Sequence, residues 1–112
     1  MQASGRSFAR KYVLTWRERP AASAADYESA QKRVLEVFQH WKMPESLRFR
    51  EFLVRVGEFG GYAVIETDKP EDIHSVTTAM AVFEFRLEPV LDVMEAVAVE
   101  VEAINWRDSI PG

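Results

Sequence analysis

The feature that most constrains this fold is an alternation of apolar and polar residues with a period of two. In residues 47–56, LRFREFLVRV, the side chains of Phe52, Val54 and Val56 fall on one side of an extended chain. The residues between them fall on the other side, so this segment predicts a strand with one face toward a core. Alternation and enrichment in β-branched and aromatic residues predict four such strands. They cover residues 8–16, 47–56, 61–67 and 83–91.

Between the first and second strands, apolar residues recur at helical spacing. From Asp26 to Trp41 they stand three or four residues apart, which predicts a helix with one buried face. Ser23, three residues before Asp26, is its predicted N-terminal cap. The pair Met43-Pro44 closes the segment.

A second helix is predicted directly after the third strand. Asp68 is its expected cap, with Glu71 completing the capping box three residues later and Pro70 in the first turn. The helix is expected to run to about Val82. The glycine-rich run GEFGG, residues 57–61, predicts a hairpin that makes the second and third strands antiparallel neighbours.

The segment after the fourth strand has two readings. Val97, Val99 and Val101 alternate, which is typical of a strand. We favour a helix because the run of about fourteen residues is long for a strand and because Asp92 with Glu95 repeats the capping pattern. The terminal segments that we expect to be irregular are residues 1–7 and 106–112.

The order strand, helix, strand, strand, helix, strand predicts an α+β fold of the ferredoxin-like kind. Its four-stranded antiparallel sheet carries two helices on one face, here with an added C-terminal helix. At 112 residues the chain is long enough for one core but short for two. Residues 1–112 are therefore expected to form a single domain.

The second face of the sheet must meet water or pack against something. It is predicted to carry Glu51, Leu53, Arg55, Arg86 and Glu88, with either Tyr12, Leu14 and Trp16 or Val13 and Thr15 from the first strand. If Tyr12, Leu14 and Trp16 lie on this face, the face exposes an apolar patch, which a two-fold homodimer would bury. If Val13 and Thr15 lie there instead, the face is mostly polar and the argument for a dimer weakens.

Composition excludes several classes of partner and site. The net charge is −4 and the basic residues are scattered, which argues against nucleic acid as a partner. No apolar run approaches the roughly 20 residues of a membrane span, and the first ten residues lack a signal-peptide core. The chain has no cysteine, so disulfides and thiolate metal sites are absent. These features predict a cytoplasmic protein without a membrane partner.

One family resemblance covers residues 11–110. It rests on KYVLTWRERP, QKRVLEVFQHWKMPES, GGYAVIETDKPEDI, FEFRLEPVLDVMEAV and WRDSI, and PVLDVMEAV is its most distinctive part. These segments resemble the domain of unknown function 3303 family, which is grouped with the dimeric α+β-barrel proteins. The resemblance implies a barrel-forming homodimer. It implies no particular reaction.

His74 is the candidate catalytic residue, since a neutral imidazole can act as a base or a ligand near pH 7. The alternative is a surface histidine, because no second group is identifiable that would orient its ring. Resemblance to barrel enzymes that act on aromatic substrates without a cofactor makes four further residues ligand-binding candidates. These are Tyr12, Trp16, Arg55 and Tyr62.

Neither a metal nor a cofactor is indicated by the motifs. Haem-degrading relatives place a histidine on the second helix, as His74 does here, but pair it with an asparagine that KYVLTW lacks. In place of their tryptophan the third strand has Tyr62. Haem binding is therefore an alternative for this chain, and haem oxidation is not expected.

Two main readings of function follow. The first is a homodimer that binds a small apolar or aromatic ligand in the barrel, with cofactor-free oxygenase or cyclase chemistry as an extension. The second is a non-catalytic dimeric module that serves in interactions. The sequence leaves open whether the protein is an enzyme.

Overall fold

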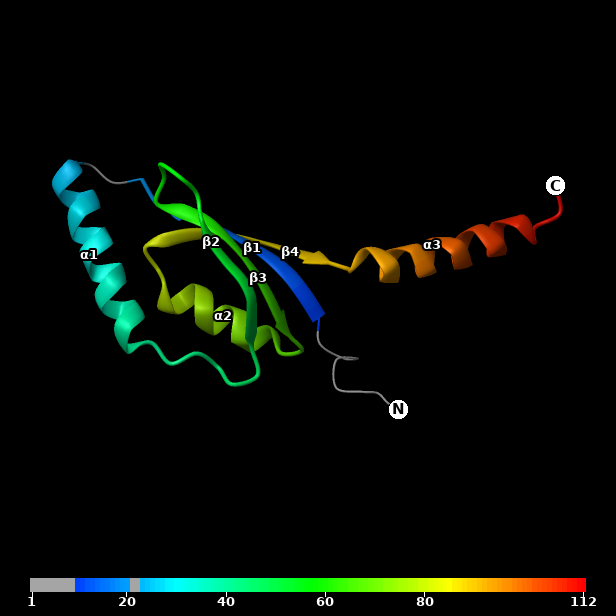
Figure 1. Cartoon of the computed structure of the whole chain (residues 1–112), viewed down its shortest axis with the longest axis horizontal. Coiled ribbons are helices and arrows are strands. Elements are labelled where there is room, and N and C mark those ends of the chain that lie inside the picture. The colour runs from blue at the N-terminus through cyan, green and yellow to red at the C-terminus, as the bar shows by residue number, and fades with distance from the viewer. Residues whose placement is uncertain (1–9, 21–22) are drawn as a thin grey trace.

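A computed structural model describes residues 10–20 and 23–112, and seven elements follow one another along them (Figure 1). They are β1 (Arg10–Glu18), α1 (Ala24–His40), β2 (Arg48–Val54), β3 (Gly60–Thr67), α2 (Pro70–Ala79), β4 (Phe83–Val90) and α3 (Val93–Asp108). This order confirms the predicted α+β class and the helix at the C-terminal end. The sequence predicted that the first strand begins at residue 8 and that residues 1–7 form an irregular N-terminal tail. Residues 1–9 lie outside the described part of the chain.

The four strands form one antiparallel sheet in the order β2-β3-β1-β4. The central strand β1 places Leu14 opposite Ala63 on one side and Leu87 on the other. The hairpin from β2 to β3 forms as the glycine-rich run predicts, with Gly57 at φ 86°. A Cβ at Gly61 would lie 1.8 Å from the Leu53 carbonyl oxygen, so only glycine fits there.

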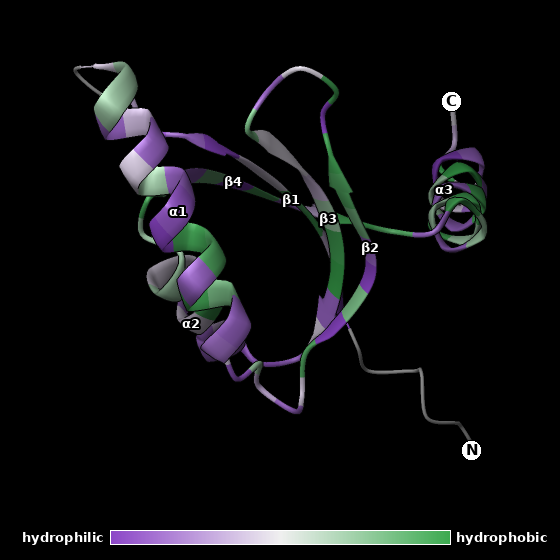
Figure 2. Cartoon of the chain, turned by 60° about the vertical axis from the view of Figure 1, so that its left-hand side comes forward, coloured by the Kyte–Doolittle hydropathy of each residue, from purple (hydrophilic) through white to green (hydrophobic). Residues whose placement is uncertain are grey.

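Helices α1 and α2 lie on the same side of the sheet (Figures 1 and 2). The innermost side chains are Leu14 and Ile65, which pack with Val76 of α2. A second buried cluster joins Trp16 and Phe83 to Met80. This core holds α2 against the sheet, whereas every residue of α1 stays at least partly exposed.

The sequence left open which alternate residues of β1 face the helices, and the structure decides between the two possibilities. Leu14 and Trp16 are 2% and 7% exposed on the helix-covered face, and Tyr12 packs beside them. Val13 and Thr15 therefore point to the open face. Tyr12 and Trp16 do not form an exposed patch there, so that argument for a dimer is lost.

Two of the three predicted helix caps are confirmed. Ser23 Oγ accepts a hydrogen bond from the Asp26 amide at 3.2 Å. At the start of α3 the Asp92 amide donates to Glu95 Oε1 at 3.1 Å.

The predicted cap of α2 by Asp68 is wrong. The N-terminal cap position is Lys69, whose amide donates to Thr67 Oγ1 at 3.0 Å. In the first turn of this helix the carboxylate of Asp72 accepts hydrogen bonds from the hydroxyl groups of Ser46 and Thr67, each at 2.6 Å. Hydroxyl donors from two other segments therefore replace the local capping box. The same helix ends at Ala79, three residues before the predicted end.

Helix α3 continues from β4 away from the sheet and its two covering helices (Figure 1). The helix extends to Asp108, whereas the irregular C-terminal tail was expected to begin at residue 106. Its start is tied to the sheet by an ion pair between Lys11 Nζ and Asp92 Oδ1. Among the described residues, no helix has the length and apolar character that crossing a membrane requires.

Candidate ligand-binding site

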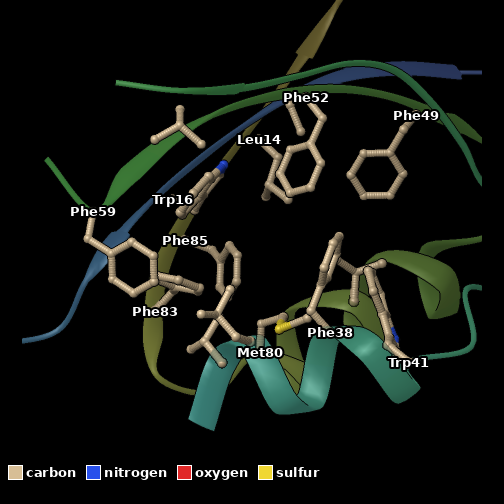
Figure 3. A pocket seen from close by; sticks show the side chains of 15 residues that line it. Leu14, Trp16, Phe38, Trp41, Phe49, Phe52, Phe59, Met80, Phe83 and Phe85 are labelled. Atoms are coloured by element: carbon tan, nitrogen blue, oxygen red, sulfur yellow. The ribbon is translucent and has the colours of Figure 1, made fainter. Parts of the chain in front are cut away.

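A cavity of about 210 Å³ lies between the sheet and the helices α1 and α2 (Figure 3). Side chains from both helices and all four strands line it, and eight of the fifteen are aromatic. Alternation explains this composition in β1 and β4, where every second residue points toward the helices. In β2 the pairing register shifts between Phe49 and Glu51, so that Phe49 and Phe52 both line the cavity although they are three residues apart.

One end of the cavity is closed by a cluster of aromatic rings. The centroids of Trp16 and Phe83 are 4.8 Å apart, and the two ring planes meet at 67°. Phe59, from the hairpin between β2 and β3, lies 6.4 Å from Trp16 and 5.2 Å from Phe83. These edge-to-face contacts are favourable arrangements for aromatic pairs and make this end rigid.

The other end opens between α1 and the edge strand β2. Phe38 of α1 faces Phe52 of β2 with centroids 6.0 Å apart, and these side chains are 46% and 50% exposed. Leu35 and Val54 beside them are also more than half exposed. Because α1 leans over the sheet without burying any of its residues, it leaves this mouth accessible.

Trp16, one of the lining residues, has a polar atom without a partner that is itself not exposed to the cavity. The indole Nε1 of Trp16 is buried and makes no hydrogen bond to any described residue. Its side chain is 93% removed from solvent, as the 7% exposure shows. Apart from the indole of Trp41, the other lining side chains that the structure describes are apolar, and none of them is titratable. The site can therefore bind an apolar body, but its own walls supply no acid or base.

Of the predicted ligand-binding residues, the structure brings only Trp16 to this cavity. Tyr12 packs against the neighbouring core. Arg55 and Tyr62 lie on the opposite side of the sheet, with the guanidinium carbon 5.0 Å from the tyrosine ring centroid. Arg55 also donates to Glu58 at 2.9 Å, and this bond raises the pKa of its guanidinium.

His74 lies in the first half of α2 and is exposed. It is not among the residues that line the cavity. Its backbone carbonyl accepts a hydrogen bond from Thr77 Oγ1 at 3.2 Å. The structure thus separates the candidate base from the aromatic cavity and from the Arg55–Tyr62 pair.

Sequence reasoning missed most of the phenylalanines that build the cavity. Phe52 of β2 and Phe83 and Phe85 of β4 were predicted to lie on the core side of their strands without a role in a site, and Phe49 was not assigned to a face. The available signal was the number of aromatic residues on that face. Four of the seven phenylalanines in the chain, Phe49, Phe52, Phe83 and Phe85, stand on two of the predicted strands.

The charged groups of the open face are organised as ion pairs. Glu66 contacts Arg50 at 2.9 Å and Lys11 at 3.9 Å, and Arg17 contacts Glu84 at 3.3 Å. Paired charges of this kind on a sheet surface are usually structural. Within residues 10–20 and 23–112, no three or more acidic or histidine side chains gather in a way that could hold a metal ion.

The chain was compared with curated proteins and with protein-family models. No curated protein matches it. A family model described as Domain of unknown function (DUF3303) matches residues 10–104, which include the whole sheet, both covering helices and most of α3. The chain belongs to this family.

Proposed function

We propose that this protein binds a small apolar or aromatic molecule in the cavity between the sheet and helices α1 and α2. The observation that carries the proposal is the lining: eight aromatic side chains around about 210 Å³, open to solvent at one end. Ligand sites are typically concave, mostly apolar and few per protein. This cavity meets each of those criteria.

The volume bounds the size of the ligand. Pockets for drug-sized ligands enclose roughly 300–1,000 Å³, and an apolar cavity of about 150 Å³ is large enough for benzene. A cavity of about 210 Å³ therefore suits a molecule with one or two fused rings. Haem is much larger, and His74 is outside the lining, so the cavity favours a smaller ligand than haem.

Binding is better supported than turnover. A cofactor-free oxygenase or cyclase needs a base in contact with its substrate, and none of the described lining residues is titratable. His74 could serve only a substrate that reaches beyond the cavity. We therefore propose a binding protein, with oxygenase or cyclase chemistry as the less supported extension.

The proposal is tested by titrating the protein with naphthalene and following heat or tryptophan fluorescence. We expect saturable binding with one site per chain. Leu35→Glu places a charge at the mouth and should weaken binding at least tenfold, because the carboxylate would be desolvated by the ligand. Gln31→Glu adds the same charge to an exposed position of α1 outside the lining and should leave binding unchanged. Absence of binding to the unaltered protein would refute the proposal.

A homodimer is the second proposal, and α3 is the observation that favours it. Its apolar residues lie on several sides of the helix (Figure 2). They are exposed, as Val93 at 75%, Met94 at 74% and Trp106 at 68% illustrate. A large exposed apolar surface of this kind normally packs against another surface. The open sheet face also exposes Leu53 and Tyr62, at 51% and 40%.

A two-fold dimer would cover both surfaces at once. Each α3 would lie against the partner copy, where large exposed apolar patches are removed from water. A helix of 16 residues is about 24 Å long, so two of them supply much of the roughly 1,200–2,000 Å² that a stable interface buries. If the dimer forms and the cavity takes no ligand, the protein is better described as a non-catalytic interaction module.

A further inference from the structure

Two exposed apolar surfaces of this chain lie at opposite ends of the molecule. One is the mouth of the cavity, whose rim consists of side chains of α1 and β2 that are 46–63% exposed, namely Leu35, Phe38, Phe52 and Val54. The other is α3, which extends away from the sheet at the end opposite to α1 (Figure 1). Because of this separation the chain does not cover its own mouth with its own α3, whereas the α3 of a second copy can reach it.

One side of α3 combines a large aromatic ring with small neighbours and an acidic border. Val99 and Trp106 are 60% and 68% exposed and stand seven residues apart, two turns along the same side of the helix. Ala103 lies between them, and Glu102 stands three residues after Val99 and four before Trp106. Aromatic anchors of this kind are enriched at protein interfaces. We call the surface formed by Val99, Ala103 and Trp106 the Trp106 side of α3.

The mouth has the length and the exposed strand edge that a helix of this size can cover. Helices α1 and α3 have 17 and 16 residues, so each is about 25 Å long. The mouth is bordered by β2, which stands at the edge of the sheet. Proteins commonly cover such an edge with a helix or a loop, because its free backbone groups otherwise pair with other chains. A helix beside α1 and over β2 would cover the apolar rim and this edge together.

The charges beside the two surfaces have opposite signs. Lys32 of α1 and Lys42, two residues after that helix, stand beside its mouth residues, and Glu28 lies one turn before Lys32. The charge next to Val99 and Trp106 on α3 is Glu102. Within residues 10–20 and 23–112, none of Lys32, Lys42 and Glu102 forms an ion pair. Two Trp106 sides would bring like charges together, whereas the mouth offers opposite ones, and such complementarity selects one partner surface over another.

The open face of the sheet suits the Trp106 side less well. Its charged side chains already form ion pairs with one another, as Glu66 does with Arg50 at 2.9 Å. A tryptophan placed over these pairs would remove them from water without supplying a new partner, which is costly. The mouth imposes no such cost, because its rim is apolar.

We propose that α3 of a second copy closes the mouth of the cavity, with Trp106 against the rings of Phe38 and Phe52. This inference rests on the proposed function and its homodimer, since it names the partner that completes the same site. The exchange is reciprocal, so a two-fold dimer contains two such contacts. Each contact then needs to bury only about half of the roughly 1,200–2,000 Å² of a stable interface. A ligand in the cavity is enclosed by both copies.

A spin label on α3 tests the contact directly. The chain has no cysteine, so a nitroxide can be attached at one chosen position, Arg107→Cys, which is exposed. This labelled chain is mixed with ¹⁵N-labelled unaltered protein. Label and observed amide then belong to different copies, so any loss of signal reports contact between copies. We expect the amides of Leu35, Phe38 and Phe52 to lose most of their intensity.

The position of the weakened amides decides the outcome. Signal loss confined to α3 or to the open sheet face, for example at Val13 and Val64, would overturn the inference, and so would no signal loss at all. Naphthalene titration of the unaltered protein separates this inference from the proposed function. If naphthalene binds and the mouth amides keep their intensity, the inference fails while the proposed function stands. If the mouth amides weaken and naphthalene does not bind, the contact is supported while the proposed function fails.

The rate of ligand release provides a second test. If α3 of the partner closes the mouth, that helix must move before a bound ligand leaves. Trp106→Ala removes the aromatic anchor and should speed the dissociation of naphthalene by about fivefold or more. Asn105→Ala is the matched control, since Asn105 is exposed and turned by about 100° around the helix from Trp106, away from Val99. It should leave the rate unchanged. Equal release rates from the unaltered protein and Trp106→Ala would contradict the inference.

Discussion

Thr67 Oγ1 donates to Asp72 Oδ2 at 2.6 Å, and both residues are buried, at 2% and 7% exposure. Ser46 Oγ donates to the same carboxylate oxygen at 2.6 Å. The end of β3, the first turn of α2 and the loop before β2 therefore meet at one carboxylate. This contact sets where α2 begins, and α2 forms one wall of the cavity.

The first prediction concerns the pH dependence of this contact. Hydrogen bonds from Ser46 and then Thr67 lower the pKa of Asp72. Because the folded-state pKa lies below the unfolded value of about 3.9, the stabilisation is fully present above that value. It is lost as the pH falls through the folded-state pKa.

Asp72→Asn should therefore lower the melting temperature by several degrees at pH 7, because a neutral amide oxygen accepts the two hydroxyl hydrogen bonds more weakly than the charged carboxylate oxygen does. The difference from the unaltered protein should stay constant from pH 8 to pH 5 and shrink below pH 4. Asp68→Asn, at the exposed position that does not cap the helix, is the control and should have little effect. Equal effects of the two substitutions would contradict the assignment of Asp72.

The second prediction concerns the hairpin glycines. Gly61→Ala would place a Cβ 1.8 Å from the Leu53 carbonyl oxygen, so the backbone of β2 must move. We expect a loss of about 3 kcal/mol or more, as for severe overpacking. Gly57→Ala, whose Cβ would meet open space but whose φ is 86°, should cost only about 1 kcal/mol. Denaturant unfolding measures both, and a similar cost for the two would be inconsistent with this register.

The third prediction separates the cavity from the exposed histidine. His74→Ala should change the affinity for naphthalene by less than twofold, because the side chain does not line the cavity. Phe52→Ala removes a ring from the mouth and should weaken binding by about tenfold. Calorimetric titration compares them. A large loss with His74→Ala alone would place the site near the histidine instead.

The fourth prediction concerns α3. If the helix lies against a second copy, the mass in solution should be twice the chain's 12.9 kDa. Val97→Glu with Val101→Glu should shift the protein to a monomer, because two charges would be buried in the interface. Glu100→Gln on the same helix is the control. Light scattering after size-exclusion chromatography reports the mass, and a monomeric unaltered protein would rule the dimer out.

The order of the elements could be predicted from the sequence because periodicity is a local property. Each strand has its two-residue alternation, and α1 has its three- and four-residue spacing. The caps at Ser23 and at Asp92 with Glu95 also involve neighbours in the chain, and both are confirmed. The capping pattern at Asp68 looked the same in the sequence, yet the structure uses Asp72, whose partners Ser46 and Thr67 belong to other segments.

The sequence by itself determined the α+β class and the hairpin at the glycine run. Alternation did not determine the covered face of β2, because a register shift after Phe49 brings both Phe49 and Phe52 to the cavity, and Val56, which was predicted on the core face, lies beyond the strand and is exposed. Only the tertiary structure decided that the Trp16 side of β1 faces the helices, because alternation defines two faces without saying which one is covered. It also decided that Arg55 and Tyr62 lie across the sheet from Trp16. The cavity depends on the distance between α1 and β2. Contacts between segments that are far apart in the chain set this distance. No local pattern in the chain encodes that distance.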